Sequence, residues 1–428
     1  AGDDGALQSG DLEGRPQRAA RRRGDLLHQQ PRDRPLVRAG AVSIAGMLRN
    51  DKKPKLRARR SKPEYRFGFR ENPATAAYRH PLCDGRRTAG NFTLVSLFSG
   101  CGGMDLSFTG GFNVLGEKYP SLPFDILGAY DFLPDAVECH KLNLGDYACL
   151  ADLKEIPVST IPAADILTGG FPCQDFSSSG PKTGFNGKRG KLYEVLVEYM
   201  RVHRPKLVVG ENVPHLARLK DGTYLTAILK AFEAEGYHFD LWELYAPDYG
   251  IPQSRRRLFF VGVRDDLPGF PVRPEPLNRH ITISEALADL EAVTDETITN
   301  QSQFFVSTKA SSGGGQGDHK NNPNKVAYCI RANARGRIQF HHHLDRRLTV
   351  RECARLQTFP DQFVFPYTTQ RNLTLIGNAV PPVLGYHVAK SVAAYLEAVL
   401  PHSFDATVSH QKGLSHERIF AIQETLFA

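Results

Sequence analysis

Residues 92–103 read Phe-Thr-Leu-Val-Ser-Leu-Phe-Ser-Gly-Cys-Gly-Gly, an apolar segment that runs directly into a glycine-rich turn. The segment Phe92–Phe98 predicts a buried strand, and Ser99–Gly103 predicts a tight turn with a helix beginning just behind it. Such a turn lets a ligand approach the backbone at a helix N-terminus, although a purely structural turn is equally consistent with the residues. The Gly-x-Gly-Gly spacing differs from the Gly-x-Gly-x-x-Gly of dinucleotide-binding loops, which counts against a nicotinamide oxidoreductase.

Outward from this strand, short apolar runs alternate with helical stretches. The pattern predicts an α/β fold with a largely parallel, Rossmann-like sheet. The segment that joins the last two strands is too short for a helical crossover, so we expect that pair to be antiparallel. Further strands are expected at Phe124–Tyr130, Asp165–Leu167, Lys206–Val209, Leu241–Tyr245 and Arg257–Val263, with helices at about 133–143, 191–202, 222–235 and 382–398.

The second half of the chain changes character. Residues 265–345 are rich in Pro and Gly and predict a small, irregular domain, with a capping box at Thr282 and Glu285 and a flexible glycine-rich loop at Ser311–Gly317. A second capping box, Thr349 with Glu352, predicts a helix through Leu356. The expected organisation is a disordered basic extension (1–90), a large domain (91–264), the small domain (265–345), a return to the large domain (346–400) and a tail without a readable role (401–428).

Composition excludes several classes of protein. No window approaches the roughly 18 consecutive apolar residues of a membrane span, and the first 30 residues lack an apolar signal-peptide core. The 7 cysteines lack the spacing of a disulfide framework or of a Cys-x-x-Cys pair, so we expect reduced thiols and no metal site. These features predict a cytoplasmic, monomeric, enzyme-sized protein.

The net charge of +8 is unevenly distributed. Residues 1–90 contain 21 Lys and Arg against 10 Asp and Glu, so the remainder is slightly acidic and any nucleic-acid affinity must come from local clusters. Residues 1–46 contain eight Arg and no Lys, and we interpret them either as upstream sequence ahead of a start at Met47 or as a basic arm that tracks phosphates. We expect one cluster to face nucleic acid: Arg331, Arg335, Arg337, Arg346, Arg347, Arg351 and Arg355.

Polar and aromatic side chains follow the ends of the next strands. Asp131 is placed to accept hydrogen bonds from ribose hydroxyls, and Phe132 to cover an adenine face. Asp152 could meet the adenine amino group in the same crevice, or could simply cap its strand. Together these residues predict a nucleoside-binding crevice beside the first turn.

A candidate nucleophile and its helpers lie at later strand ends. Cys173 follows an apolar strand and the sequence Gly-Gly-Phe-Pro, and a polar stretch comes after it; the alternative is a small buried cysteine. Glu211 emerges at the end of another buried strand, where a carboxylic acid can share a proton with a base. Arg257 could pair with Glu211 while Arg255 reaches the backbone or the base, although a structural salt bridge would use the same residues.

Six blocks in this order resemble the signature blocks of bacterial DNA (cytosine-5) methyltransferases. They are Phe-Ser-Gly-Cys-Gly-Gly, Gly-Phe-Pro-Cys-Gln-Asp-Phe-Ser, Glu-Asn-Val, Gln-Ser-Arg-Arg-Arg, Arg-Glu-Cys-Ala-Arg-Leu-Gln-Thr-Phe-Pro and Gly-Asn-Ala-Val-Pro-Pro, and the resemblance covers about residues 91–398. It implies an S-adenosylmethionine-dependent methyltransferase domain with a small target-recognition domain, acting on double-stranded DNA. A restriction endonuclease that acts on the same site is the partner expected by analogy.

The resemblance also implies roles for individual residues. Cys173 would add to carbon 6 of a flipped cytosine, Glu211 would contact N3 and the amino group, and Arg257, with Arg255 beside it, would contact O2. The cofactor pocket would be formed by Phe98, Ser99, Gly100, Cys101, Gly102, Gly103, Asp131, Phe132, Asp152, Pro172, Leu192 and Asn378. The DNA contacts would be made by Gln174, Ser177, Gln253, Gln316 and Arg331.

Three positions depart from, or extend, the family pattern. Asp131 stands where the family more often has Glu, and Gly187-Lys188-Arg189-Gly190 replaces an acidic approach to the Arg-Gly pair. Gln316 resembles a residue that fills the space left by an extruded base. Two alternatives remain: an RNA (tRNA) cytosine-5 methyltransferase, whose chemistry is the same, and a catalytically silent DNA-binding relative.

Overall fold

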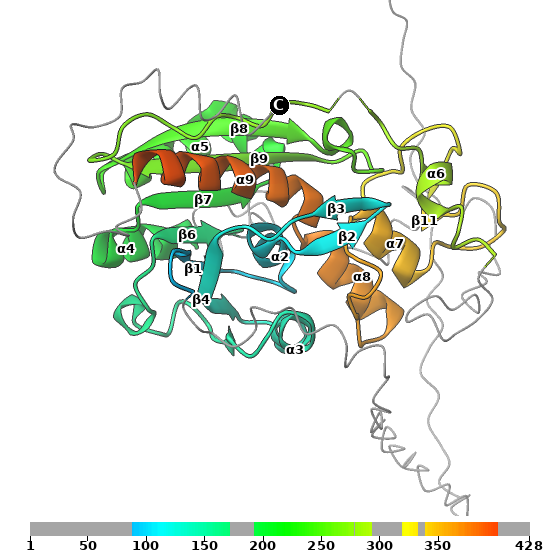
Figure 1. Cartoon of the computed structure of the whole chain (residues 1–428), viewed down its shortest axis with the longest axis horizontal. Helices are drawn as coiled ribbons and strands as arrows, with labels where there is room; N and C mark the ends of the chain where they lie inside the picture. Colours follow the sequence, from blue (N-terminus) through cyan, green and yellow to red (C-terminus); the bar gives the residue numbers. More distant parts are fainter. Residues whose placement is uncertain (1–87, 172–191, 278, 293–318, 333–338, 401–428) are drawn as a thin grey trace, which may run out of the picture. The chain divides into compact units, whose positions relative to one another are not determined.

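A seven-stranded sheet forms the centre of the protein (Figure 1). The computed structural model describes residues 88–171, 192–277, 279–292, 319–332 and 339–400. The strand order is β5-β4-β1-β6-β7-β9-β8; the first five are parallel, whereas β9 is antiparallel to β7 and β8. The strands are β1 (Phe92–Leu97), β4 (Phe124–Asp131), β5 (Ala148–Leu150), β6 (Ile166–Gly169), β7 (Leu207–Asn212), β8 (Tyr237–Tyr245) and β9 (Arg256–Arg264).

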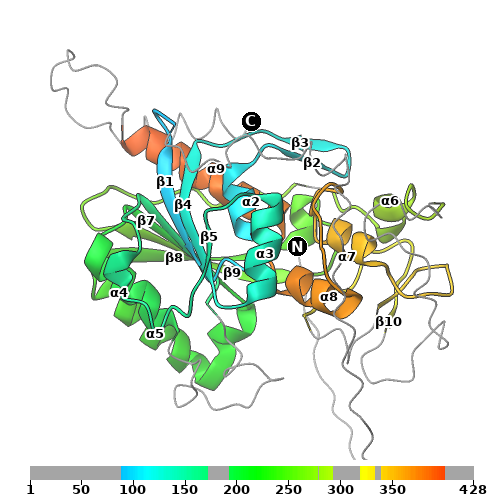
Figure 2. The ribbon, with the colours of Figure 1, turned by 90° about the horizontal axis from the view of Figure 1, so that it is seen from below.

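Both faces of this sheet are covered by helices, because alternate side chains on the central strands point to opposite sides. On one side, Val95 of β1 packs with α4 (Tyr193–His203) and α5 (Thr223–Glu233). On the other, Leu94 packs with α2 (Gly103–Thr109) and α9 (Pro382–Val399). Figure 2 shows the helices of these two groups on opposite sides of the strands. The result is the three-layer arrangement of doubly wound α/β proteins.

The long C-terminal helix α9 lies directly on α2, the helix that follows the first turn. Gly385 of α9 allows this close approach, because a Cβ atom there would collide with the side chain of Ser107. The last described helix is therefore packed against the first strand-turn-helix unit. Smaller elements complete this domain: α3 (Pro134–Asn143), the hairpin β2 (Phe112–Val114) and β3 (Glu117–Tyr119), and the 3-10 segments η1 (Val158–Thr160), η3 (Pro214–Gly222) and η4 (Ala246–Tyr249).

The region after residue 264 contributes short elements. These are α6 (Ile283–Leu287), β10 (His319–Lys320), β11 (Gln339–Phe340), α7 (Val350–Leu356) and α8 (Thr369–Asn378). Both predicted capping boxes are confirmed: Thr282 and Thr349 each accept from the backbone N–H of a glutamate three residues on, which reaches back to the cap. Apolar side chains of α6 share one core cluster with α7 and α8, so the described part of residues 265–345 is packed onto the large domain.

The predicted strands and helices all occur, with ends that differ by a few residues, and the antiparallel pairing of the last two strands is confirmed. The elements β5, α8 and the β2–β3 hairpin were not predicted. The predicted loop at Ser311–Gly317, the tail at 401–428 and all but the last residues of the N-terminal extension lie outside the described residues. Among the described helices, none is long and apolar enough to cross a membrane.

Candidate active site

Two hydrogen bonds from backbone N–H groups of the turn after β1 join it to the end of β4. Ser99 N donates to Tyr130 O at 3.0 Å, and Gly100 N donates to Asp131 Oδ2 at 2.9 Å. Phe98 adopts a left-handed conformation with φ 57°, which is rare for a residue with a side chain and is found where the surroundings impose it. A Cβ atom on Gly100 would meet nothing within 4 Å, so this part of the turn borders open space.

The second half of the turn is closely packed. A Cβ on Gly102 would collide with Leu144 and His140, and one on Gly103 would lie 2.5 Å from Val380 O. Glycine is therefore needed at both positions, because α3 and the segment after α8 approach the backbone. Cys101 is buried and donates to Leu375 O at 3.7 Å, so its thiol points into α8. The start of the Gly-Asn-Ala-Val-Pro-Pro block thus lies against the first turn, with Asn378 exposed at the end of α8.

Asp131 links the turn to α3. Its two carboxylate oxygens accept from Gly100 N and from Leu133 N, both at 2.9 Å, and burial raises its pKa against the opposing effect of these hydrogen bonds. Phe132 next to it is 51% exposed, unusually open for an aromatic ring. Asp152 lies two residues beyond β5, where its side chain accepts from Lys154 N at 3.1 Å, a contact that favours its capping alternative.

Glu211 and Arg257 form the predicted ion pair. Arg257 Nε lies 2.7 Å from Glu211 Oε1, and the two side chains are 12% and 11% exposed. The antiparallel pairing of β9 with β7 explains the contact, since the start of β9 lies beside the end of β7, with Asn212 opposite Leu258. The structure thus confirms the predicted ion pair. The pair lies at the carboxyl edge of the sheet, which is also the edge that carries the turn after β1.

The segment that leads to Cys173 passes next to this pair. A Cβ on Gly170 would lie 3.4 Å from Glu211 Oε2, and Asn212 Nδ2 donates to Phe171 O at 3.0 Å. Asn212 was not predicted to have a role of its own, although it belongs to the Glu-Asn-Val block. Its side chain ties the end of β7 to the residue before Pro172. Pro172, Cys173, Gln174, Ser177 and Gln316 themselves lie outside the described residues.

Two further buried groups lie near these loops. Ser99 Oγ and Thr168 Oγ1 are buried and have no hydrogen-bond partner among the described residues. Leu192, the N-cap of α4, is buried in the core cluster that contains α4 and α5. A buried hydroxyl without a partner calls for an explanation, and a bound polar ligand is one. Thr168 was not predicted, because no motif contains it.

Arg255 and Gln253 lie behind the site, in a packed junction. Arg255 is 2% exposed and donates to Ile330 O, Gly377 O and Ala379 O at 2.9, 3.0 and 2.9 Å. Burial lowers its pKa to about 10, which leaves it charged at neutral pH. Of the two contacts predicted for Arg255, to the backbone or to the base, the structure therefore shows the contact to the backbone.

Gln253 is also fully buried. It is 0% exposed and forms hydrogen bonds with Leu356 O and Ile330 N, so the predicted DNA contact of Gln253 is wrong for this structure.

The predicted nucleic-acid-facing arginine cluster is also wrong in part. Arg351 is completely buried and donates to Pro360 O and Phe363 O, while Arg346 donates to both carboxylate oxygens of Glu352 at 2.8 and 2.7 Å. Arg355 is buried against acidic side chains of neighbouring segments. Arg331 and Arg347 are exposed, and Arg335 and Arg337 lie outside the described residues. These buried arginines hold local loops together.

Comparison with known sequences gives a consistent result. The family model of the C-5 cytosine-specific DNA methylase matches residues 92–330 and 302–394. The Type II methyltransferase M.NgoFVII of Neisseria gonorrhoeae is 32% identical over 373 residues, covering 78% of this chain and 92% of the relative. M.MthTI of Methanothermobacter thermautotrophicus is 31% identical, covering 72% of this chain and 99% of the relative.

Solved structures share the fold. A protein encoded within an Escherichia coli prophage gives a TM-score of 0.56 at 21% identity, covering 72% of this chain and 100% of the other. The Entamoeba histolytica methyltransferase EhMeth gives 0.53 at 16% identity, covering 71% and 98%. At these identities the structures support the architecture alone, and the sequence matches carry the family relationship.

Proposed function

The chain belongs to the C-5 cytosine-specific DNA methylase family, and on that premise we propose that it transfers a methyl group from S-adenosylmethionine to C5 of a cytosine flipped out of duplex DNA. The enzyme is thus a DNA (cytosine-5) methyltransferase. The observation that carries the proposed assignment of residues is the Glu211–Arg257 pair at 2.7 Å, beside the segment that leads to Cys173.

The first turn and its neighbours fit the cofactor. Open space borders Gly100, the Ser99 hydroxyl has no partner among the described residues, and the ring of Phe132 is half exposed. We propose that Asp131 and Ser99 bind polar groups of the nucleoside and that Phe132 stacks on the adenine. Bound there, S-adenosylmethionine supplies an electrophilic methyl group. Asn378, which ends α8 next to the turn, would close the pocket from the other side.

The chain's own groups act on the base. A cytosine must leave the base stack before a protein group can reach its C6, at a cost of a few kcal/mol. In the proposal, the Cys173 thiolate forms a bond to C6, which makes C5 nucleophilic. Glu211 shares a proton with N3 and accepts from the amino group as negative charge develops on the ring, and Arg257 binds O2 while fixing the carboxyl group. After methyl transfer, a water molecule takes the C5 proton, the electrons of that bond restore the C5–C6 double bond, and the S–C6 bond breaks to return the thiolate, while the N3 proton returns to Glu211.

Residues 265–345 are proposed as the target-recognition region. Arg331, exposed and directly after the buried Ile330, is the described residue that we propose to contact DNA. The backbone there is fixed, because Arg255 binds Ile330 O and a Cβ on Gly377 would collide with Ala332. The named relatives are Type II methyltransferases, so we propose that the enzyme protects sites of a restriction endonuclease. We further propose that it acts as a monomer in the cytoplasm, as its composition predicts.

A methyl-transfer assay tests the proposal. Purified full-length protein is incubated with tritiated S-adenosylmethionine and either mixed-sequence duplex DNA or tRNA, and bisulfite sequencing of the product then locates the modified cytosines. The proposal expects label in duplex DNA at C5. Label in tRNA alone would establish the RNA alternative, and no label in either, with cofactor and DNA binding intact, would establish the silent relative.

The role of Glu211 is tested in the same assay. Glu211→Gln keeps the shape but removes the charge, and should slow methylation by about 10²–10⁴-fold. The matched control is Glu243→Gln, which alters the exposed Glu243–Arg256 pair on the adjacent strands, 3.8 Å apart. Equal rates for E211Q and the wild type would reject the assignment.

A further inference from the structure

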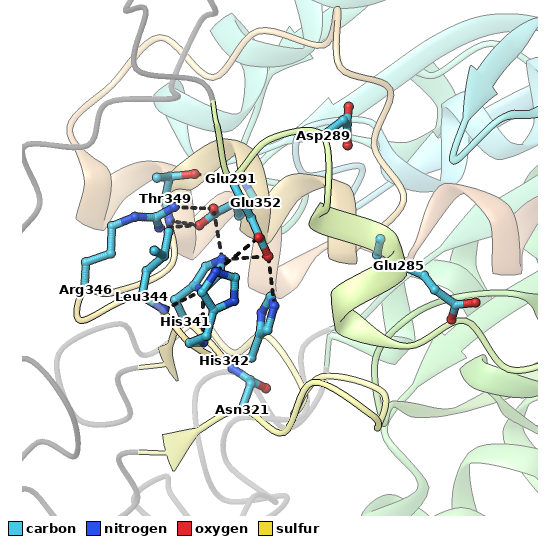
Figure 3. Close-up of polar contacts among 12 residues, drawn as sticks. Glu285, Asp289, Glu291, Asn321, His341, His342, Leu344, Arg346, Thr349 and Glu352 are labelled. Carbon is cyan, nitrogen blue, oxygen red and sulfur yellow. Dashed lines mark hydrogen bonds and ion pairs between the residues drawn. The ribbon is translucent and has the colours of Figure 1, made fainter.

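Three consecutive histidines gather around one glutamate at the base of the proposed recognition region. His341, His342 and His343 directly follow β11, and Glu291 lies four residues after α6. One possible ligand atom of each of these four residues lies within 4.8 Å of those of the other three. Figure 3 shows Glu291 and Glu352 beside the rings of His341 and His342. The cysteine spacing predicts no metal site, and only the fold brings Glu291 next to the three histidines.

Several polar atoms of this cluster are buried without a hydrogen bond. They are Glu291 Oε1, His341 Nε2 and both ring nitrogens of His342. His342 Nε2 and Glu291 Oε1 form an ion pair at 2.8 Å, but their geometry is not that of a hydrogen bond. An ion bound between this buried nitrogen and this carboxylate oxygen would satisfy both atoms.

The surroundings divide these residues into two groups. His341 Nδ1 accepts from His343 N and Leu344 N at 3.3 and 3.1 Å, so in the neutral ring the proton is on Nε2, which cannot then bind a metal. Glu352, 3.7 Å from His341 Nε2, is already bound by Arg346 through both oxygens. His341 and Glu352 therefore serve as neighbours of the site rather than as ligands.

The remaining three residues have suitable donor atoms, and each histidine nitrogen lies close to one oxygen of Glu291. His342 Nε2 lies 2.8 Å from Glu291 Oε1, and His343 Nε2 lies 3.2 Å from Glu291 Oε2. Donor atoms around a tetrahedral zinc ion are about 3.3 Å apart, given bonds of about 2.0–2.1 Å. The side chain of His342 is completely buried, whereas His343 is 51% and Glu291 21% exposed, which leaves a solvent side for entry and for a bound water.

We propose that Glu291, His342 and His343 bind a divalent transition-metal ion of the zinc type, with water completing the coordination. Two imidazoles and a carboxylate suit Zn²⁺ and Co²⁺, whereas Mg²⁺ and Ca²⁺ prefer oxygen ligands throughout. The ion would join the two ends of the segment between residues 291 and 341, and so stabilise its base. This site is separate from the methyl-transfer site, and its test does not depend on catalysis.

The test is metal binding by the full-length protein, purified without a histidine tag and freed of metal with a chelator. Equilibrium dialysis against micromolar Zn²⁺ should give one bound ion per chain, and Co²⁺ should give the visible absorption of a four-coordinate ion. Zn²⁺ should raise Tm by about 5 °C. Failure to retain one equivalent of either ion at these concentrations would overturn the proposal.

Variants identify the ligands. His343→Ala and Glu291→Gln alter partly exposed side chains, so both proteins should fold, and each should weaken Zn²⁺ binding at least about tenfold and abolish the Tm rise. The matched control is His280→Gln, which removes an exposed histidine that lies 2.9 Å from Asp248, away from the cluster. Unchanged affinity in H343A and E291Q, or an equal loss in H280Q, would show that the ion binds elsewhere.

Discussion

Arg255 and Arg257 are two residues apart in one motif, yet they belong to two different regions. Arg257 pairs with Glu211 at the carboxyl edge of the sheet and keeps part of its surface open. Arg255 lies in the junction behind that edge, where main-chain carbonyls of three residues surround its guanidinium group. Arg255 precedes β9, which begins at Arg256, whereas Arg257 lies within the strand, so the alternation of side chains along β9 does not place the two arginines on one face. A charged motif therefore contains both a group available to substrate and a group that holds the fold together.

Substitutions in these two regions should have different consequences. Changes at the carboxyl edge should reduce methylation and leave stability nearly unchanged, because the edge residues have solvent or ligand on one side. Changes in the junction should reduce stability first, because each buried carbonyl left without a donor carries a cost. The following predictions test this separation.

The largest expected effect is that of Cys173→Ser. A hydroxyl is a far weaker nucleophile than a thiolate at neutral pH, so methylation should fall below detection while DNA and cofactor affinity stay unchanged. Methyl-transfer rates and DNA-binding titrations measure the two properties. Cys149→Ser, at the exposed Cys149 of β5, is the control and should keep the normal rate. Normal methylation by C173S would remove the nucleophile assignment.

Arg255→Met and Arg257→Met compare the regions directly. Arg255→Met leaves the carbonyls of the junction unpaired and should lower the free energy of unfolding by about 3 kcal/mol. Arg257→Met leaves one carboxylate without its partner at an edge that solvent reaches, so it should lower the free energy of unfolding by less than Arg255→Met does, but it should slow methylation about 10²-fold or more. Denaturant unfolding and methylation rates of both proteins are the measurements.

Arg256→Met is the control for both, since Arg256 lies between them in sequence and its side chain is 55% exposed. It should affect neither property measurably. If Arg255→Met and Arg257→Met had the same effect on stability, the distinction between edge and junction would fail.

Asn212→Ala is expected to have an intermediate effect. It removes the hydrogen bond to Phe171 O and so loosens the segment before Pro172, which should reduce kcat about 10-fold or more without weakening DNA binding. Steady-state kinetics separate kcat from KM. Asn113→Ala, at an exposed position of β2, is the control. A change in KM alone would mean that Asn212 acts on binding and not on positioning.

Phe132→Ala should have the smallest effect. Loss of the ring that we propose to stack on adenine should weaken S-adenosylmethionine binding about tenfold, with the maximum rate largely restored at saturating cofactor. Calorimetric titration measures the affinity. Phe270→Ala, at another exposed phenylalanine, should leave it unchanged. Equal affinity in F132A and the wild type would mean that the ring serves another purpose.

Features set by local residues could be predicted from the sequence. The strand before the first turn and both capping boxes follow from patterns within a few residues. The Glu211–Arg257 pair was predicted from motifs at two strand ends, whereas the β7–β9 pairing that brings the two residues together was not predicted. By contrast, β5 has three residues, and α8 begins Thr-Gln-Arg-Asn and has few apolar residues. Such elements depend on tertiary packing, which a local pattern does not contain.

The burial of the arginines shows the same limit. Arg346, Arg351 and Arg355 were expected to face nucleic acid because arginines cluster there, but all three are buried and bind carboxylates or carbonyls of the protein. Arg355, for example, binds Asp289, which is 66 residues away. An arginine that binds carbonyls and one that binds phosphates have the same sequence signal, and only the surrounding fold distinguishes them.

The most direct test of the account is a covalent trap. The wild-type enzyme is incubated with S-adenosylmethionine and duplex DNA that carries 5-fluorocytosine at a site mapped by bisulfite sequencing, and the products are separated under denaturing conditions. A stable protein–DNA adduct is expected, with the cross-linked peptide containing Cys173, and no adduct with C173S. Normal methylation of cytosine DNA without any adduct, or an adduct at another residue, would contradict it.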